Sequence, residues 1–234
     1  MFEMVASARG DPALVVLEGF HAVKHALRFG ADVVALATPD RAGLMAMVAA
    51  LAPDLADRLS GAEDLGREGF TRLSPHPIPT PALAVALRPH HDPATVIGAG
   101  GRVVLLDRPN HLGNLGAVIR VAAAAGAAAV VTTGDRDPWD PAALRGSAGL
   151  HFALPVVRVS TVPDRPRPLV ALDPGGTPLM PGMVPATALL AFGSERKGLD
   201  AGLLAGADLC ISIAMRPGVS SLNLATAAAV ILYS

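Results

Sequence analysis

The sequence predicts an α/β protein: a mostly parallel sheet with helices on both faces, preceded by a smaller α/β domain. Short apolar runs alternate along the chain with stretches of helical periodicity, which is typical of parallel strands buried on both faces. Hydrophobic residues make up 51% of the 234 residues, enough for a sizeable core, and the 24 Gly and 21 Pro predict many short turns. Pro, His and Gly residues break all periodicity over 88–101. We therefore predict one domain at 1–95 and a second at 100–234.

The first domain is expected to be a small layered α/β unit. One of its helices should end at Gly30, and one of its strands should stop at Thr38-Pro39, because proline has no N–H for the strand ladder. The expected elements, in chain order, are a strand at 14–17, a helix at 20–29, a strand at 33–37, helices at 41–51, 55–59 and 63–69, and a strand at 82–87.

The second domain has the more regular alternation. Its expected strands lie at 103–107, 128–132, 154–159, 169–172, 189–192 and 209–213, and its helices at 115–125, 142–148 and 199–205, with an apolar helix at the C-terminal end. In sheets of this kind ligands bind at the carboxyl ends of the strands, so the turns that follow the strands are the places to look for chemistry.

Composition excludes several kinds of site. Cys210 is the only cysteine, so a disulfide within the chain and a Cys-based metal site are excluded, and no His-rich or carboxylate-rich constellation supports metal-assisted hydrolysis. The sequence has no signal peptide and no apolar run of about 18 residues. We expect a cytoplasmic protein without metal or membrane. The net charge of -1 predicts no strong nonspecific capture of nucleic acid, but it leaves an RNA partner open.

Polar, glycine-containing turns follow three of the predicted strands. The first contains Asn114, at the expected start of a helix, and Arg120 six residues later. The second, Phe192-Gly-Ser-Glu195, places a charge directly after a buried strand, which is costly unless the turn opens into solvent or a site. Taken alone, the first turn favours an ordinary capped helix with one solvated arginine.

The third turn leads into the apolar C-terminal helix. A helix that is apolar on every face is expected to be buried, yet its first turn contains Ser220, Ser221 and Asn223. These groups can cap the helix, or they can hold a ligand where free N–H groups point outward. This stretch alone favours capping.

Taken together and in this order, the three turns resemble the signature motifs of the TrmH (SpoU) branch of the SPOUT methyltransferases. The matching motifs are Asn114-x5-Arg120, Phe192-Gly-Ser-Glu195, Ile213-x-Met215 and Ser221-Leu-Asn223. The resemblance covers about residues 102–232 and implies transfer of a methyl group from S-adenosylmethionine to a ribose 2′-hydroxyl of RNA. The first domain is similar, more weakly, to the L30e-like RNA-binding domain that often precedes this catalytic domain.

The resemblance also implies roles for single residues. Arg120 corresponds to the essential arginine of the family, and the groups around it would be Asn114, Glu195, Ser221 and Asn223. S-adenosylmethionine would be held in a pocket made by a deep trefoil knot, and the residues of that pocket would be Gly193, Ile213, Met215 and Leu222. The final helix would serve a homodimer interface. A guanidinium stays protonated up to a pKa above about 12, so we favour Arg120 as a clamp that orients the ribose rather than as a base.

Three sites depart from the family pattern. His111-Leu112 stands where Asp-Pro is often found, and Val121 and Ala123 stand where a polar pair often follows the arginine. Neither of these sites belongs to the core motif set, so we expect altered loop packing or RNA contact rather than loss of activity. Ala214 replaces a frequent proline before Met215, which is expected to loosen that loop.

Two other functions are open at this stage. One is a noncatalytic RNA-binding or ribosome-assembly protein that keeps the fold. The other is a nucleotide-dependent enzyme of ordinary doubly wound fold, which the missing GxGxxG fingerprint disfavours. Among RNA substrates the family implies both tRNA and rRNA, and the L30e-like unit favours rRNA.

Overall fold

The computed structural model describes residues 1–162 and 167–234, and the chain divides into two compact units. The first unit comprises Met1–His90 together with the short segment Ala148–Ala153, and the second comprises His91–Ser147 and Leu154–Ser234. The chain thus passes into the second unit within the aperiodic stretch 88–101. The return of Ala148–Ala153 to the first unit has no counterpart in the sequence pattern.

The first unit is built on a four-stranded sheet of strand order β1-β4-β2-β3. Its strands are β1 (Leu14–Glu18), β2 (Val33–Thr38), β3 (Glu63–Asp64) and β4 (Leu83–Leu87). Strand β4 runs antiparallel to both β1 and β2, whereas β2 and β3 are parallel. The sheet of this unit is therefore mixed.

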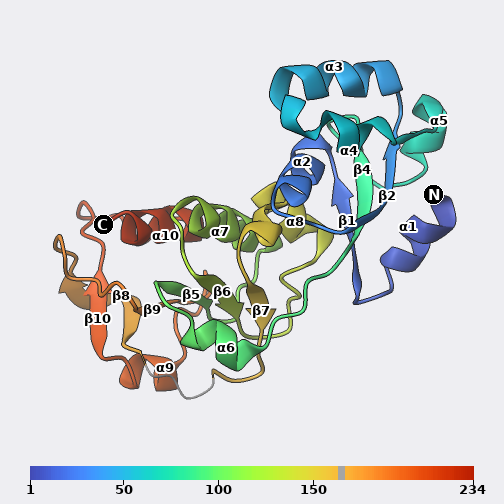
Figure 1. Cartoon of the computed structure of the whole chain (residues 1–234). Helices are drawn as coiled ribbons and strands as arrows, with labels where there is room; N and C mark the ends of the chain where they lie inside the picture. The colour runs from blue at the N-terminus through green and yellow to red at the C-terminus, as the bar shows by residue number, and fades with distance from the viewer. Residues whose placement is uncertain (163–166) are drawn as a thin grey trace. The chain divides into compact units, whose positions relative to one another are not determined.

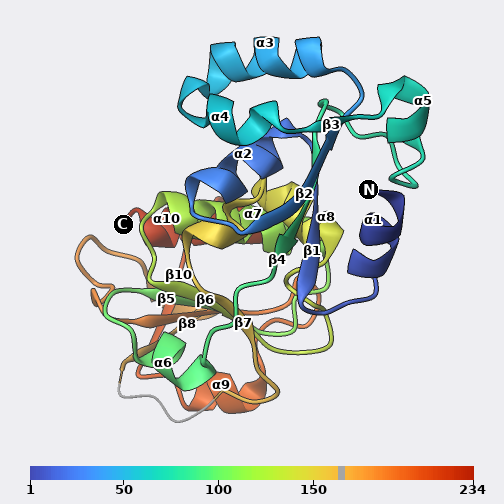
Figure 2. The same cartoon turned by 45° about the vertical axis from the view of Figure 1, so that its right-hand side comes forward.

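Helices cover both faces of this sheet (Figure 2). They are α1 (Phe2–Ala8), α2 (Phe20–Arg28), α3 (Arg41–Leu51), α4 (Ala56–Ser60) and α5 (Gly66–Thr71), with a 3₁₀ turn at Pro53–Leu55. Val5 of α1 and Phe70 of α5 pack with Val16, Leu83 and Val85 in one apolar cluster. Successive residues of a strand point to opposite faces of the sheet. The residues of β1 and β4 that alternate with those of this cluster therefore point to the other face, where α2 contacts both strands.

The second unit contains a six-stranded sheet of order β10-β8-β9-β5-β6-β7 in which every pair is parallel (Figure 1). The strands are β5 (Val103–Leu106), β6 (Ala129–Thr132), β7 (Val156–Arg158), β8 (Leu169–Pro178), β9 (Leu189–Phe192) and β10 (Leu209–Ser212). The predicted parallel α/β architecture is confirmed here. In a parallel sheet all carboxyl ends lie along one edge, so the turns after β5, β9 and β10 reach the same side of the unit.

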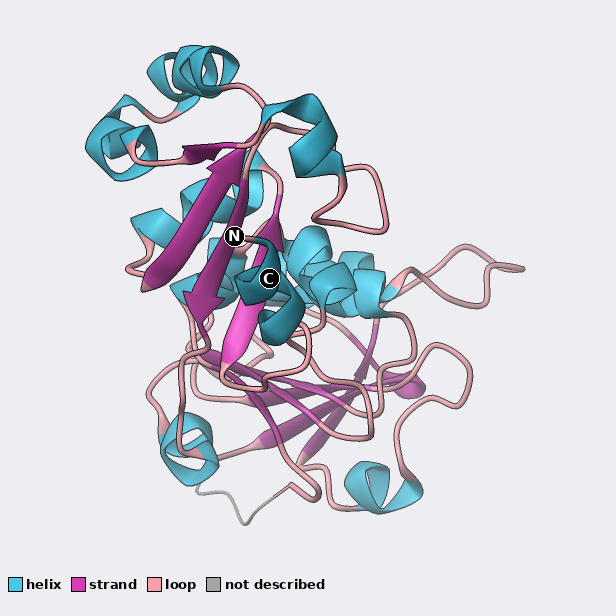
Figure 3. Cartoon of the chain, turned by 90° about the vertical axis from the view of Figure 1, so that its right-hand side faces the viewer, coloured by secondary structure: helices cyan, strands magenta, loops and turns pink. Residues whose placement is uncertain are grey.

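Helices lie on both faces of this sheet as well (Figures 1 and 3). Those on one face are α7 (Leu112–Ala124), α8 (Pro141–Ser147) and α10 (Leu224–Leu232), and those on the other are α6 (Pro93–Gly98) and α9 (Ala201–Ala205). Val103 and Leu105 of β5 pack with Ile97 of α6 and Leu203 of α9. In the part of the chain that the structure describes, no helix is both long enough and apolar enough to cross a membrane.

Most predicted strands and helices are confirmed, but several elements or their boundaries were wrong, among them the end of β8, which lies at Pro178 instead of residue 172. The helix expected at 63–69 is strand β3 followed by α5, because Gly66 adopts a φ of 63° and starts the helix afresh. Helix α6 lies in the stretch expected to be irregular, where Asp92 accepts a hydrogen bond from Thr95 N and caps it. Helix α7 begins at Leu112 instead of 115, and α10 begins only at Leu224. Helix α1 had no counterpart among the predicted elements.

Helices α7 and α8 approach each other closely at Gly116. A Cβ atom placed on Gly116 would lie 2.1 Å from Ala143 O and 2.9 Å from Gly146 Cα, both backbone atoms that cannot move aside easily. Gly113, one turn earlier on the same helix, has open space around the equivalent position. The two glycines therefore have different physical reasons to be present.

We predict that Gly116→Ala destabilises the fold by about 1–3 kcal/mol, because the added methyl forces the two helices apart. The matched variant Gly113→Ala should stabilise it by about 0.5–1 kcal/mol, since alanine loses less backbone entropy in a helix. Urea unfolding of both variants measures the free energies. Equal effects of the two substitutions would contradict the close helix contact.

Candidate functional site

Three turns that are distant in the sequence are joined by side-chain hydrogen bonds. Asn114, in the first turn of α7, donates from Nδ2 to Oε1 of Glu195 over 2.9 Å. Asn223 donates from Nδ2 to Oδ1 of Asn114 over 3.0 Å. The Oδ1 atom of Asn223 accepts from Ala225 N over 2.9 Å and so caps α10. Three of the predicted catalytic residues thus form one connected chain.

Glu195 is the charged end of this chain. Its second oxygen accepts from the backbone N–H of Asn110 over 3.2 Å, just before the start of α7. Partial burial acts to raise the pKa of Glu195, but the hydrogen bonds from Asn114 and Asn110 N outweigh it and hold the pKa below its usual value. The free N–H groups at the N-terminus of α7 favour a negative charge in the same place. Glu195 is therefore a carboxylate, and not a proton donor, at neutral pH.

A pocket of about 160 Å³ lies where the middle of β8 meets the end of β10, and its lining includes Ser221 and Leu222, which directly precede Asn223. Strand β8 leaves its pairing with β10 between Ala171 and Thr177, and part of the unpaired stretch lines the pocket. The lining is mostly apolar, with three hydroxyls and one carboxylate, as is usual for a small-molecule site. Its residues are Leu172, Asp173, Pro174, Ile211, Ser212, Ile213, Met215, Ser220, Ser221, Leu222 and Ala227.

The pocket collects most of the predicted cofactor residues. Ile213, Met215 and Leu222 line it, and so does Ser221, which the resemblance assigned to the reaction. Ser220 and Ser221 lie ahead of α10 and not in its first turn, because the helix begins only after Asn223. Capping and ligand binding are therefore divided among these groups: the asparagine caps the helix, and the two serines face the pocket.

Two predicted residues lie outside this lining. Gly193 follows β9, and a Cβ atom there would come within 2.2 Å of the backbone of Gly198 and Leu199, so glycine is needed for the close turn of its own loop. Arg120 is an exposed residue of α7. It follows Asn114 by six residues, which places the two side chains on different faces of the helix. The single chain does not bring Arg120 into the network of Glu195, Asn114 and Asn223.

Asp173 was not among the predicted residues, although it had a sequence signal. It follows the predicted strand 169–172 directly, and Glu195 likewise follows the strand 189–192 after only two residues. Its Oδ1 atom accepts from Gly175 N over 2.8 Å, and the carboxylate lines the pocket. Burial, together with the nearby charge of Asp173, raises the pKa of the Cys210 thiol. The cysteine is therefore a neutral thiol and not a nucleophile.

The chemistry available here is narrow. Among the described residues, no group of three or more His, Cys, Asp or Glu side chains could hold a metal ion. The polar groups at the pocket and the adjoining network are two carboxylates, hydroxyls and two amides. Such groups bind and orient a ligand, but they offer no general acid at neutral pH. A reaction that depends on positioning fits this set better than one that depends on proton donation.

Comparison with known proteins identifies the family of this chain. Residues 101–233 match the model of the SpoU rRNA Methylase family. The 23S rRNA (guanosine(2553)-2'-O)-methyltransferase RlmP of Bacillus subtilis is 34% identical over 178 residues, which cover 72% of this chain and 70% of that protein. The 23S rRNA (uridine(2479)-2'-O)-methyltransferase of Streptomyces viridochromogenes is 36% identical over 146 residues, covering 56% of this chain and 50% of that enzyme.

A solved structure resembles nearly the whole chain. It is the SpoU methyltransferase AviRb from Streptomyces viridochromogenes in complex with the cofactor AdoMet. The two chains are 25% identical and superpose with a TM-score of 0.78 over 99% of this chain and 95% of that one. All three turns that form the network and the pocket lie inside the region that matches the family model.

The depressed pKa of Glu195 predicts a specific dependence of stability on pH. A carboxylate whose folded pKa lies below its unfolded value of about 4.3 stabilises the fold above that pH, and this contribution is lost as the pH falls through the folded pKa. Wild type should therefore be more stable than Glu195→Gln at about pH 6, and the difference should shrink towards about pH 3. Urea unfolding at both pH values measures it. Glu68→Gln, at an exposed position of α5, is the control, and a gap for Glu195→Gln that stays constant with pH would contradict the assignment.

Proposed function

We propose that this chain, which belongs to the SpoU rRNA Methylase family, transfers a methyl group from S-adenosylmethionine to a ribose 2′-hydroxyl of ribosomal RNA. The observation that supports this most directly is the pocket at β8 and β10, whose lining residues Ser221 and Leu222 directly precede Asn223 of the hydrogen-bonded chain. The two relatives described above are named for 2′-O-methylation of 23S rRNA, which favours rRNA over tRNA.

The residues of the pocket suit S-adenosylmethionine. Leu172, Ile211 and Ile213 offer apolar surface for the adenine ring. The hydroxyls of Ser220 and Ser221 and the carboxylate of Asp173 offer partners for ribose hydroxyls and an ammonium group. Bound there, the cofactor supplies an electrophilic methyl group on a sulfonium. The trefoil knot that the family resemblance implies around this pocket stays a prediction.

The chain's own contribution is orientation. Glu195 and Asn223 fix both ends of the Asn114 amide and hold the first turn of α7 against the start of α10. Arg120, exposed on α7, binds the phosphate next to the target ribose and places the 2′-hydroxyl in line with the methyl group. Its fixed positive charge stabilises the oxygen as negative charge develops. The proton of the hydroxyl leaves to a phosphate oxygen or to solvent, because a guanidinium does not accept it.

Other parts of the chain have supporting roles in this proposal. The unit of Met1–His90 binds a folded RNA element, as the L30e-like pattern implies. The C-terminal helix forms a homodimer interface: Val230 of α10 and Tyr233, directly after it, are large apolar residues left exposed at 38% and 68% in the single chain. A second subunit would also be the source of groups that complete the site around the exposed Arg120.

The proposed reaction is tested with purified protein, labelled S-adenosylmethionine, and separate pools of unmodified rRNA and tRNA. Label in rRNA, found as 2′-O-methylnucleoside by mass spectrometry, is the expected result. Label in tRNA alone would overturn the rRNA assignment. Binding of RNA without any transfer would favour the alternative, a noncatalytic assembly protein that keeps the fold.

We predict that Ala227→Leu reduces the affinity for S-adenosylmethionine at least roughly 10-fold, because the larger side chain fills a pocket that Ala227 lines. Isothermal calorimetry measures the dissociation constant, and circular dichroism checks that the fold is kept. An unchanged dissociation constant would show that the cofactor binds elsewhere.

We predict the converse result for Arg120→Ala. This variant should bind S-adenosylmethionine as wild type does, because Arg120 lies outside the pocket lining, but it should lose methyl transfer by roughly 100-fold or more. Arg120→Lys should recover only part of the activity, since an ammonium cannot reproduce two-pronged phosphate contact. Methyl transfer by Arg120→Ala at the wild-type rate would remove Arg120 from the mechanism.

A further inference from the structure

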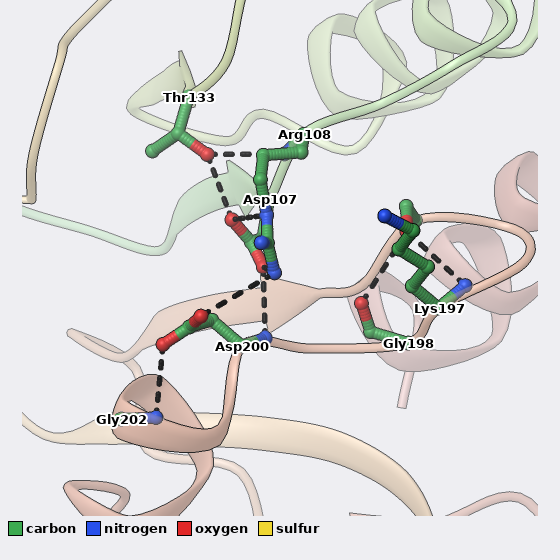
Figure 4. A network of polar contacts seen from close by, with 8 residues as sticks. Asp107, Arg108, Thr133, Lys197, Gly198, Asp200 and Gly202 are labelled. Atoms are coloured by element: carbon green, nitrogen blue, oxygen red, sulfur yellow. Dashed lines mark hydrogen bonds and ion pairs between the residues drawn. The ribbon is translucent and has the colours of Figure 1, made fainter.

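Asp107, directly after β5, has a buried carboxylate with a full set of hydrogen bonds (Figure 4). Its Oδ1 atom accepts from Thr133 Oγ1 over 2.8 Å and from Arg108 Nε over 3.1 Å. Its Oδ2 atom accepts from Arg108 Nη2 over 2.9 Å and from the backbone N–H of Asp200 over 2.9 Å. The side chain is only 4% exposed, so its oxygens have little access to water. Loss of one of these hydrogen bonds would therefore leave a buried acceptor unsatisfied and destabilise the fold.

The contacts of Asp107 meet at the two ends of one loop. Its backbone N–H donates to Phe192 O, at the end of β9, over 2.9 Å. Its carboxylate accepts from the backbone N–H of Asp200, at the start of α9. The loop between these points carries Glu195. Asp107 therefore ties the start of the loop to its end.

The loop has few other means of support. Ser194 and Gly198 exchange two backbone hydrogen bonds of 3.1 and 3.0 Å. The side chains between them, Glu195, Arg196 and Lys197, are exposed, so no buried apolar group anchors the tip. The position of Glu195 depends on the base of the loop and on its contacts with Asn114 and Asn110 N.

Arg108 compensates the negative charge of the buried Asp107 carboxylate. Its guanidinium pairs with Asp107 and also lies 3.6 Å from Asp200 Oδ2, so it bridges the acid and the residue that the acid holds. The backbone of Arg108 adopts a φ of 49°, which is unusual for a residue other than glycine, and its N–H donates to Thr133 Oγ1 over 3.0 Å. A strained conformation of this kind persists only where the surrounding contacts fix it.

We propose that Asp107 is a positioning residue for methyl transfer: it closes the base of the 193–199 loop and thereby holds Glu195 against Asn114. The effect on the reaction rests on the proposed function, whereas the closure of the loop does not. A carboxylate is required because both of its oxygens accept from donors. An asparagine at position 107 would replace one of these oxygens by an NH₂ group. In one orientation the NH₂ would face the donors Asp200 N and Arg108 Nη2, and in the other it would face the donor Arg108 Nε. In both cases donors would oppose each other.

The test compares Asp107→Asn with the matched control Thr133→Val. The control removes a hydrogen bond of the same carboxylate on the oxygen that does not contact the loop, together with the bond that Thr133 accepts from Arg108 N. Hydrogen exchange is followed at Ser194 N and Gly198 N, which bond to each other's residues and not to Asp107, and at the amides of β5 as a measure of global stability. In Asp107→Asn, exchange at the two loop amides should speed up roughly 10-fold relative to β5, while Thr133→Val should change loop and strand alike.

Methyl transfer supplies the second readout. Asp107→Asn should lower kcat roughly 10-fold in the wild-type background. In a Glu195→Gln background the same substitution should lower kcat little further, because Asp107 acts on the reaction through Glu195. Exchange that rises equally in loop and strand, or fully additive losses of kcat, would overturn the proposal. Absence of transfer in the wild-type protein would instead refute the proposed function, and the exchange experiment would still decide whether Asp107 holds the loop.

Discussion

The site depends on one directed chain of hydrogen bonds that runs from the N-terminus of α10 to the carboxylate of Glu195. Ala225 N donates to Asn223, Asn223 donates to Asn114, and Asn114 donates to Glu195. Every donor points towards the negative charge, so each bond polarises the next, and the cap of α10 and the charge at α7 strengthen one another. Reversing either amide would set two donors or two acceptors face to face. The chain therefore specifies both the orientation of the asparagines and the approach of the three turns.

Much of this arrangement could be predicted from the sequence, for identifiable reasons. The parallel sheet followed from near-continuous apolar runs such as 103–106 and 189–192, and parallel strands bring their carboxyl-end turns to one edge, so Asn114, Glu195 and Asn223 could be expected to meet. The break in β8 could not be predicted, because its strand pairing resumes at Thr177 only through a shift against β10, and no local pattern encodes that shift. For the same reason Asp173 was overlooked: the predicted strand stopped at residue 172, while the pocket lies in the stretch beyond it. The start of α10 was placed too early because its apolar composition gave no sign of where the Asn223 cap would be.

The glycines of the second unit show how closely the backbone is packed behind the site. Gly116 allows α8 to pack closely against α7. At Gly176 in β8, an added Cβ atom would lie 2.7 Å from backbone atoms of β10. Gly193 allows a similarly close approach inside the loop that carries Glu195. At all three positions the obstacle is a backbone atom and not a flexible side chain. These close approaches fix the helices and strands that carry the polar chain, so the hydrogen bonds act between elements that are already in place.

In the proposed reaction, a site of this composition acts through position and not through proton transfer. Methyl transfer from a sulfonium requires an in-line nucleophile, and alignment alone accounts for a large share of the rate in such reactions. The structure provides for alignment in successive steps: Asp107 ties the ends of a loop, the loop presents Glu195, and Glu195 holds Asn114. Asn114 in turn meets Asn223, which follows directly on the pocket residues Ser221 and Leu222. The residues that would hold the cofactor are thus joined, through the backbone at Asn223 and its hydrogen bond to Asn114, to the helix that carries Arg120.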